Sequence, residues 1–236
     1  MKVLVTGSTQ GIGKAIAKAF VNRGDNVIIH CSKDANKAEK IKNEIGASDS
    51  IVCDLSNMEE TKAFFDMTGP VDCLILNASV QYKNDWTKVS EEELDRQINV
   101  DLKSTYILMQ KYIPPMKEKG FGRVVTIGSV NQFRNHPELT VYSSLKCAVA
   151  CLVRNIAKQI APYGVTVNNV SPGAIITPRN QSVYEDESAR KNVEKSIPLG
   201  RFGTPDEVVG AIMLLCSENG SYITGTDISV DGGLKL

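Results

Sequence analysis

Three side chains of this sequence could together carry acid–base chemistry. Tyr142 and Lys146 are four residues apart, and Ser129 precedes the tyrosine by thirteen residues. In a helix, positions i and i+4 lie on one face, so the lysine ammonium would sit beside the phenol. A phenol ionises near pH ~10, and a neighbouring cation favours the phenolate. The pair is therefore a candidate general acid and base, and the Ser129 hydroxyl is available to hold a carbonyl oxygen.

A glycine-rich turn lies near the N-terminus, between the apolar run 2–6 and the helical stretch 14–23. Its glycines follow the spacing G-x-x-x-G-x-G. Glycine permits positive φ and close approach of the backbone to a ligand, and a helix N-terminus offers free N–H groups to a pyrophosphate. An ordinary strand-to-helix turn is the alternative. The candidate cofactor residues of this turn are Gly7, Ser8, Gln10, Gly11, Ile12 and Gly13.

The whole chain resembles the short-chain dehydrogenase/reductase family. The resemblance implies that Tyr142 protonates the substrate oxygen, that Lys146 supports the tyrosine and holds the nicotinamide ribose, and that Ser129 orients the carbonyl. The motifs that carry it, in the family's order, are Thr6-Gly7-x-x-x-Gly11-Ile12-Gly13, Asn77-Ala78, Ser129, Tyr142-x-x-x-Lys146, Pro172-Gly173, and the stretches 198–208, 223–226 and 230–233.

Strand-like apolar runs alternate with helical segments along the chain, which predicts a parallel sheet with helices on both faces. We expect one α/β domain over residues 1–236, Rossmann-type and doubly wound, with about seven strands and its ligand at the carboxyl ends of the strands. Long helices are expected near 91–117 and 141–161, and the polar segment 178–200 is expected to form a substrate lid. The predicted strands are 3–6, 26–30, 50–53, 73–76, 123–127, 166–170 and 227–230.

Composition excludes several partner classes. The chain has 27 basic and 27 acidic residues, which gives no reason to expect nucleic acid or an anionic membrane as partner. No apolar run is long enough to span a bilayer, and the first strand starts too early for a signal peptide. The six cysteines lack metal-type spacing and predict free thiols, no metal and a cytoplasmic location. The family resemblance implies a homo-oligomer, a tetramer or a dimer.

The adenosine half of the cofactor site is predicted from the second and third strands. Asp54, followed by Leu55, resembles the family aspartate that touches the adenine ring, although a helix-capping role is also open. NAD-preferring relatives carry an acid after the second strand, and the matching position here is Cys31. Ser32 and Lys33 could receive a 2′-phosphate, so NADP(H) is favoured and NAD(H) is the alternative. Gln10 argues the other way, because many NADP-binding relatives have arginine there.

Two positions depart from the family pattern near the nicotinamide. Asp101 stands where relatives have the asparagine that kinks a helix and holds a water on the lysine's proton route, so its part in a relay is open. Ser79 replaces a glycine. The remaining candidate nicotinamide-binding residues, assigned by resemblance, are Asn77, Ala78, Pro172, Gly173, Ile175 and Thr177.

Polar residues are concentrated where the substrate would bind. Gln132 and Arg134 lie between the serine and the tyrosine, and Arg179 begins the expected lid. An arginine can bind a carboxylate through two hydrogen bonds. We therefore expect a small polar hydroxy or keto compound, such as a sugar, sugar acid or polyol. The first alternative is reduction of a 3-oxoacyl group on acyl carrier protein, and the second is a non-catalytic NADP(H)-binding regulator.

Overall fold

The computed structural model describes residues 1–236 and contains one seven-stranded sheet in which every strand pairing is parallel. The strand order is β3-β2-β1-β4-β5-β6-β7. The predicted fold class is confirmed, and the strand positions agree with the expected runs to within a few residues. The strands are β1 (Lys2–Val5), β2 (Asn26–Cys31), β3 (Asp49–Val52), β4 (Cys73–Leu76), β5 (Gly122–Ile127), β6 (Val165–Pro172) and β7 (Asp227–Val230).

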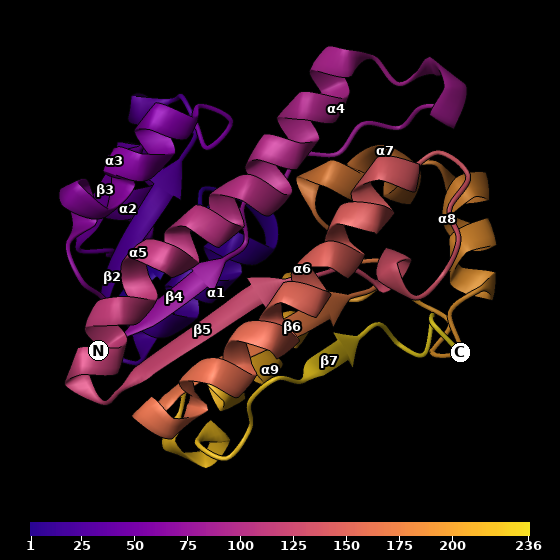
Figure 1. Ribbon diagram of the computed structural model, residues 1–236. Helices are drawn as coiled ribbons and strands as arrows, with labels where there is room; N and C mark the ends of the chain where they lie inside the picture. The colour runs from indigo at the N-terminus through magenta and orange to yellow at the C-terminus, as the bar shows by residue number, and fades with distance from the viewer.

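Three helices cover each face of the sheet (Figure 1). Alternate strand side chains point to opposite faces, so Val3 and Val5 pack in one core while Leu4 packs in the other. The helices of the first face are α1 (Gly11–Asn22), α2 (Ala35–Ile45) and α9 (Pro205–Leu215). Those of the second face are α3 (Met58–Thr68), α5 (Ser104–Lys119) and α6 (Thr140–Ile160). No helix is both long and apolar enough to cross a membrane.

The direction of winding reverses between β1 and β4. From β1 the chain proceeds to β2 and β3 on one side, and then returns to β4 on the other side. Connections leave the carboxyl ends of β1 and β4 in opposite directions, and this divergence opens a crevice that α/β proteins use for ligands. A cavity of about 560 Å³ lies there and is lined by residues that follow β1, β4, β5 and β6. Its volume is within the range typical of small-molecule sites.

The long helix expected near 91–117 is interrupted. It begins as α4 (Glu91–Gln97), where Ser90 and Glu93 form a reciprocal capping box. The next segment, Ile98–Lys103, is π-helical, and α5 continues from it. A π-helical turn widens the helix by one residue and re-aims side chains, and such turns are frequent at functional sites. Asp101 lies in this turn.

The segment 178–200 lies beyond the carboxyl ends of β5 and β6 (Figure 1). Ile197 packs with Val130 and Leu234, and Tyr184 packs edge-on against Phe202. These contacts attach the segment to the body of the molecule, and its movement as a lid stays a prediction. It contains η5 (Pro178–Asn180), α7 (Gln181–Glu185) and α8 (Glu187–Lys195). The other short helical turns are η1 (Trp86–Lys88), η3 (Val130–Gln132), η4 (Ala161–Tyr163) and η6 (Glu218–Gly220).

Candidate active site

The fold brings the three acid–base candidates to one wall of the cavity. Tyr142 and Lys146 lie on the inner face of α6, and Ser129 follows the carboxyl end of β5. The Lys146 ammonium is 5.4 Å from the centre of the Tyr142 ring. All three residues are nearly buried, yet each contributes surface to the cavity. The arrangement presents a phenol, a hydroxyl and a cation to one ligand.

Lys146 is held by two contacts inside the protein. Its ammonium donates to the carbonyl of Ile127 at 3.0 Å and lies 3.1 Å from Asp101 Oδ1. The other carboxylate oxygen, Asp101 Oδ2, accepts from the Val80 amide at 3.1 Å. Burial raises the pKa of Asp101, and the charge of Lys146 partly offsets this effect. Asp101 does not line the cavity. It therefore acts on the ligand only through the lysine and the loop after β4.

The backbone of Asp101 is also engaged. Its carbonyl accepts a hydrogen bond from the Thr105 hydroxyl at 2.9 Å. In this chain the carboxylate therefore touches the lysine directly, and the carbonyl accepts from a neighbouring side chain.

The glycine-rich turn is packed tightly against the loop after β4. Gly7 and Gly11 have φ of +62° and +54°, values that favour glycine. A side chain at position 13 would place its Cβ 2.4 Å from the Gly7 carbonyl oxygen and 2.5 Å from Asn77 Nδ2. That Asn77 amide donates to the carbonyls of Thr6 and Gly7, both at 2.9 Å. The turn is thus fixed from the loop after β4, and binding of a pyrophosphate at the start of α1 stays a prediction.

His30 supports the turn from below and was missed by sequence reasoning. Its Nδ1 accepts from the Gly7 amide at 2.9 Å, and its Nε2 donates to the Cys53 carbonyl at 2.8 Å. Burial lowers the pKa of His30, so the ring is neutral with its proton on Nε2. Ser8 is also buried, where it donates to the Val5 carbonyl and accepts from the His30 amide. Unlike the rest of the predicted turn residues, Ser8 does not line the cavity.

At the end of the cavity that is expected to hold the adenosine, two lysines lie in different surroundings. Lys33 is exposed, does not line the cavity, and lies 3.2 Å from Asp54 Oδ2. Lys37 does line the cavity and was not predicted. Partial burial raises the pKa of Asp54, but hydrogen bonds from Ser56 and Lys33 lower it by more. The pKa of Asp54 therefore lies below its usual value. The predicted residues that do line this end are Gln10, Ser32, Asp54 and Leu55.

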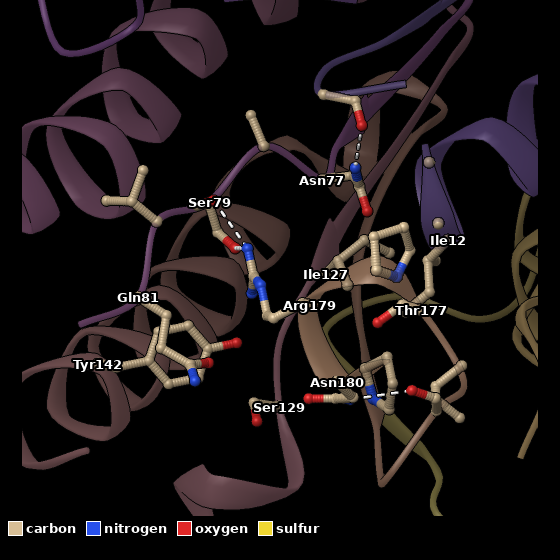
Figure 2. A pocket seen from close by; sticks show the side chains of 18 of the residues that line it. Ile12, Asn77, Ser79, Gln81, Ile127, Ser129, Tyr142, Thr177, Arg179 and Asn180 are labelled. Carbon is tan, nitrogen blue, oxygen red and sulfur yellow. Dashed lines mark hydrogen bonds between the residues drawn. The ribbon is translucent and has the colours of Figure 1, made fainter. Parts of the chain in front are cut away.

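The end of the cavity that is expected to hold the substrate is rich in cations. Arg179 Nη2 donates to the Ser79 carbonyl at 2.8 Å and to the Ser79 hydroxyl at 2.9 Å, and Figure 2 shows the guanidinium turned toward Ser79. Lys83 and Arg134 line the same cavity. The only carboxylate that lines the cavity is Asp54, which belongs to the adenosine end.

The other predicted residues of this region divide into two groups. Gln132 is directed away from the cavity, and its amide donates to Asp227 on β7. His136, which was not among the predicted residues, also lines the cavity, and its pKa is lowered by burial and by the nearby charge of Lys83. The predicted nicotinamide-binding residues all line the cavity, namely Asn77, Ala78, Pro172, Gly173, Ile175 and Thr177.

Comparison with known proteins identifies the class. The family model described as enoyl-(acyl carrier protein) reductase matches residues 7–235. The 3-oxoacyl-[acyl-carrier-protein] reductase FabG of Rickettsia prowazekii is 32% identical over 99% of this chain and 96% of its own length. The structure of a 3-oxoacyl (acyl-carrier-protein) reductase from Agrobacterium tumefaciens C58, with NADP bound, has a TM-score of 0.93 and 34% identity, covering 98% of this chain and 93% of that chain.

A third protein points to a different substrate. The structure of a candidate NAD(P)-dependent gluconate 5-dehydrogenase from Beutenbergia cavernae, with NADP bound, has a TM-score of 0.91 and 30% identity, covering 99% of this chain and 96% of that chain. The chain belongs to the short-chain dehydrogenase/reductase family. It is an NAD(P)-dependent oxidoreductase that acts on CH–OH or C=O groups.

Proposed function

We propose that this enzyme interconverts a secondary alcohol and a ketone on a small polar substrate that carries a carboxylate, of the sugar-acid type, with NADP(H) as cofactor. The observation that carries the substrate class is the charge of the cavity. Lys83, Arg134 and Arg179 line it, while no carboxylate lines its substrate end. Cations in a partly enclosed cavity attract anions more strongly than in open water. The likeness to a candidate gluconate 5-dehydrogenase supports the same class.

In the proposed reaction, the Tyr142 hydroxyl gives its proton to the carbonyl oxygen of the substrate. The Ser129 hydroxyl donates a hydrogen bond to the same oxygen and orients it. The Lys146 ammonium stabilises the negative charge left on the phenol, and Ile127 and Asp101 keep the ammonium in place. The nicotinamide cofactor, when bound, supplies or accepts the hydride. In the direction of alcohol oxidation the proton returns to the tyrosine.

The preference for NADP(H) is proposed from the end of β2. Cys31 and Ser32 line the cavity there, and neither of these two positions carries a carboxylate that would bond the ribose hydroxyls or repel a 2′-phosphate. The two similar structures described above contain NADP, which supports the preference. The remaining adenosine would lie along Asp54 and Leu55, and the pyrophosphate along the glycine-rich turn.

Arg179 gives a direct test of the substrate class. Ser79 occupies one nitrogen of its guanidinium, which leaves other N–H groups for a substrate carboxylate. We expect Arg179→Ala to raise KM for a keto-sugar acid by about tenfold or more, and to change KM for the matching neutral keto-sugar much less. Arg190→Ala is the matched control, since Arg190 lies in the same segment but pairs with Glu194 and does not line the cavity. An equal rise in KM for the keto-sugar acid and the neutral keto-sugar in Arg179→Ala would contradict the proposal.

The second candidate is reduction of a 3-oxoacyl group on acyl carrier protein. The reductases of this activity from Rickettsia prowazekii and Agrobacterium tumefaciens C58 are among the similar proteins. Val183, Val193 and Phe202 line the cavity and could contact an acyl chain. Faster reduction of an acetoacetyl thioester than of any keto-sugar acid would favour this candidate. Tight NADPH binding without turnover of any carbonyl would instead favour a non-catalytic regulator.

A homo-oligomer, either a dimer or a tetramer, is proposed from the outer surface of α5 and α6. An apolar groove runs between these helices, and Tyr106 within it is 45% exposed. A second copy of the chain that packs its own α5 and α6 there would remove this surface from water. The groove residues are Leu102, Lys103, Tyr106, Ile107, Ala148, Cys151, Leu152 and Asn155. The cytoplasmic location stays a prediction from composition.

A further inference from the structure

We propose that Lys37, oriented by Gln10, is the cation that binds the adenosine 2′-phosphate of NADP(H), and that Lys33 is not. This inference rests on the proposed cofactor preference and deepens it. Lys37 belongs to the first turn of α2, five residues beyond Ser32 along the chain. Both Lys37 and Ser32 line the cavity at the end of β2, where the ribose of a bound adenosine would face the protein.

The geometry fixes the Lys37 ammonium without neutralising it. Its Nζ donates to Gln10 Oε1 at 2.7 Å, and the ammonium forms no ion pair with a carboxylate. Gln10 comes from the glycine-rich turn, so the contact joins this turn to α2, and both residues line the cavity. A glutamine holds a lysine through a neutral oxygen, and the lysine keeps its full charge and two further N–H donors for a phosphate. Gln10, which stands where many NADP-binding relatives have an arginine, thus holds a cation that comes from α2.

The other two cations at this end share one carboxylate, that of Asp54. The Lys33 ammonium lies 3.2 Å and the Arg96 guanidinium 4.0 Å from the same oxygen of Asp54. The Asp34 carboxylate caps α2 by accepting from the Lys37 amide at 2.8 Å, and Asp34 does not line the cavity. The first turn of α2 therefore has a capped N-terminus. Recognition of an anion here depends on side chains, and Lys37 is the cavity-lining cation at this end that has no carboxylate within ion-pair distance.

The test uses binding alone, so it does not depend on the substrate. Dissociation constants for adenosine 2′,5′-bisphosphate and 5′-AMP, and for NADPH and NADH, are measured by titration calorimetry on the wild type and three variants. We expect Lys37→Ala to raise the dissociation constants of adenosine 2′,5′-bisphosphate and NADPH by about tenfold or more. The dissociation constants of 5′-AMP and NADH are expected to change by less than about threefold. Lys33→Ala is the matched control. It is expected to change the ratio of dissociation constants within each ligand pair by no more than about threefold.

Gln10→Glu provides an independent variant. The new carboxylate would pair with Lys37 and repel a phosphate, so the 2′-phosphorylated ligands are expected to lose affinity while 5′-AMP and NADH lose little. Thermal unfolding of each variant shows whether the fold is kept. The inference would be overturned if Lys37→Ala kept the wild-type ratio of dissociation constants within each ligand pair. A selective loss of affinity for the 2′-phosphorylated ligands in Lys33→Ala would also overturn it, and in both cases the NADP(H) preference would stand. Tighter binding of NADH than NADPH by the wild type would overturn both.

Discussion

Lys146 and Asp101 form the most consequential contact at the level of single residues. The side chains of both are almost completely inaccessible to solvent, at 5% and 0% exposure. A buried ammonium is costly unless it is paired and hydrogen-bonded. Here the carboxylate supplies the opposite charge and the Ile127 carbonyl supplies a hydrogen bond. The aspartate thus does more than occupy the position of an asparagine, because it anchors Lys146 beside Tyr142.

Replacing Asp101 by asparagine measures what the carboxylate contributes. The amide can still accept from the Val80 N–H, but the Lys146 ammonium loses its counter-charge. We expect the free energy of unfolding at neutral pH to fall by about 3 kcal/mol, as is typical when one partner of a buried pair is removed. Denaturant unfolding measures this change. Asp72→Asn is the control, because Asp72 pairs with the exposed Lys119 and should contribute about 1 kcal/mol or less.

An equal effect of the two substitutions would show that the buried pair adds no more than a surface pair does. Asp101 would then be retained for some property other than stability.

At the scale of elements, the cofactor site depends on contacts between neighbouring strands. His30 on β2 connects the turn after β1 to the loop after β3 through two hydrogen bonds. Asn77 after β4 holds the same turn from the opposite side. The glycine-rich turn is therefore fixed by His30 and Asn77 as well as by its own glycines.

The neutral state of His30 predicts a dependence of stability on pH. Burial lowers the pKa of His30 in the folded protein, whereas an unfolded histidine titrates near 6.5. The folded state thus resists protonation, so the stability contributed by His30 is present above pH ~6.5 and is lost as pH falls below it. A protonated Nδ1 would also oppose the Gly7 amide, donor against donor. Between about pH 7.5 and 5, the free energy of unfolding is expected to fall by up to about 1.4 kcal/mol per pH unit.

His30→Asn isolates this effect, because asparagine can accept from the Gly7 amide but does not titrate. The variant is expected to be less stable at neutral pH and to show a shallower slope with pH. His136→Asn serves as the comparison, since His136 is also a histidine whose pKa is lowered, but it lies far from the turn in the chain. A slope for His30→Asn equal to that of the wild type would refute the assignment.

Sequence reasoning predicted the elements well and some of their contacts poorly. Strands and long helices follow from hydrophobic periodicity, and the catalytic spacing of Tyr142 and Lys146 is a property of any helix. The π-helical turn at Asp101 has no such signal. The sequence could not show which of Lys33 and Lys37 lines the cavity, because the direction of a side chain beyond the end of a strand depends on the geometry of the turn. Gln132 and Ser8 carry suitable groups, but their orientation depends on packing with β7 and β2.

At the scale of the whole molecule, the surface of α5 and α6 predicts self-association. Tyr106→Glu would place a charge in the apolar groove, and burying an unpaired charge at an interface is unfavourable. We expect the wild type to sediment as a dimer or tetramer and Tyr106→Glu to sediment as a smaller species. Tyr222→Glu is the matched control, because Tyr222 is fully exposed and lies outside the groove. A monomeric wild type, or dissociation of both variants alike, would contradict the proposed interface.

At the scale of the whole molecule, one cavity has cations at both of its ends. The adenosine end contains Lys37, and the substrate end contains Arg179 and Arg134. Ser129, Tyr142 and Lys146 lie on the wall of the same cavity, as the catalytic proposal requires. The charge of each end therefore predicts an anionic group on each ligand, a 2′-phosphate on the cofactor and a carboxylate on the substrate.

The measurement that tests this account most directly is NADPH oxidation by the wild type and by Tyr142→Phe. The substrate panel contains a keto-sugar acid, its neutral keto-sugar and an acetoacetyl thioester. We predict the highest kcat/KM for the keto-sugar acid, and a loss of about a hundredfold or more in Tyr142→Phe with the dissociation constant for NADPH unchanged. Turnover that persists in Tyr142→Phe, or a wild type that prefers the thioester, would contradict the proposed site or the proposed substrate respectively.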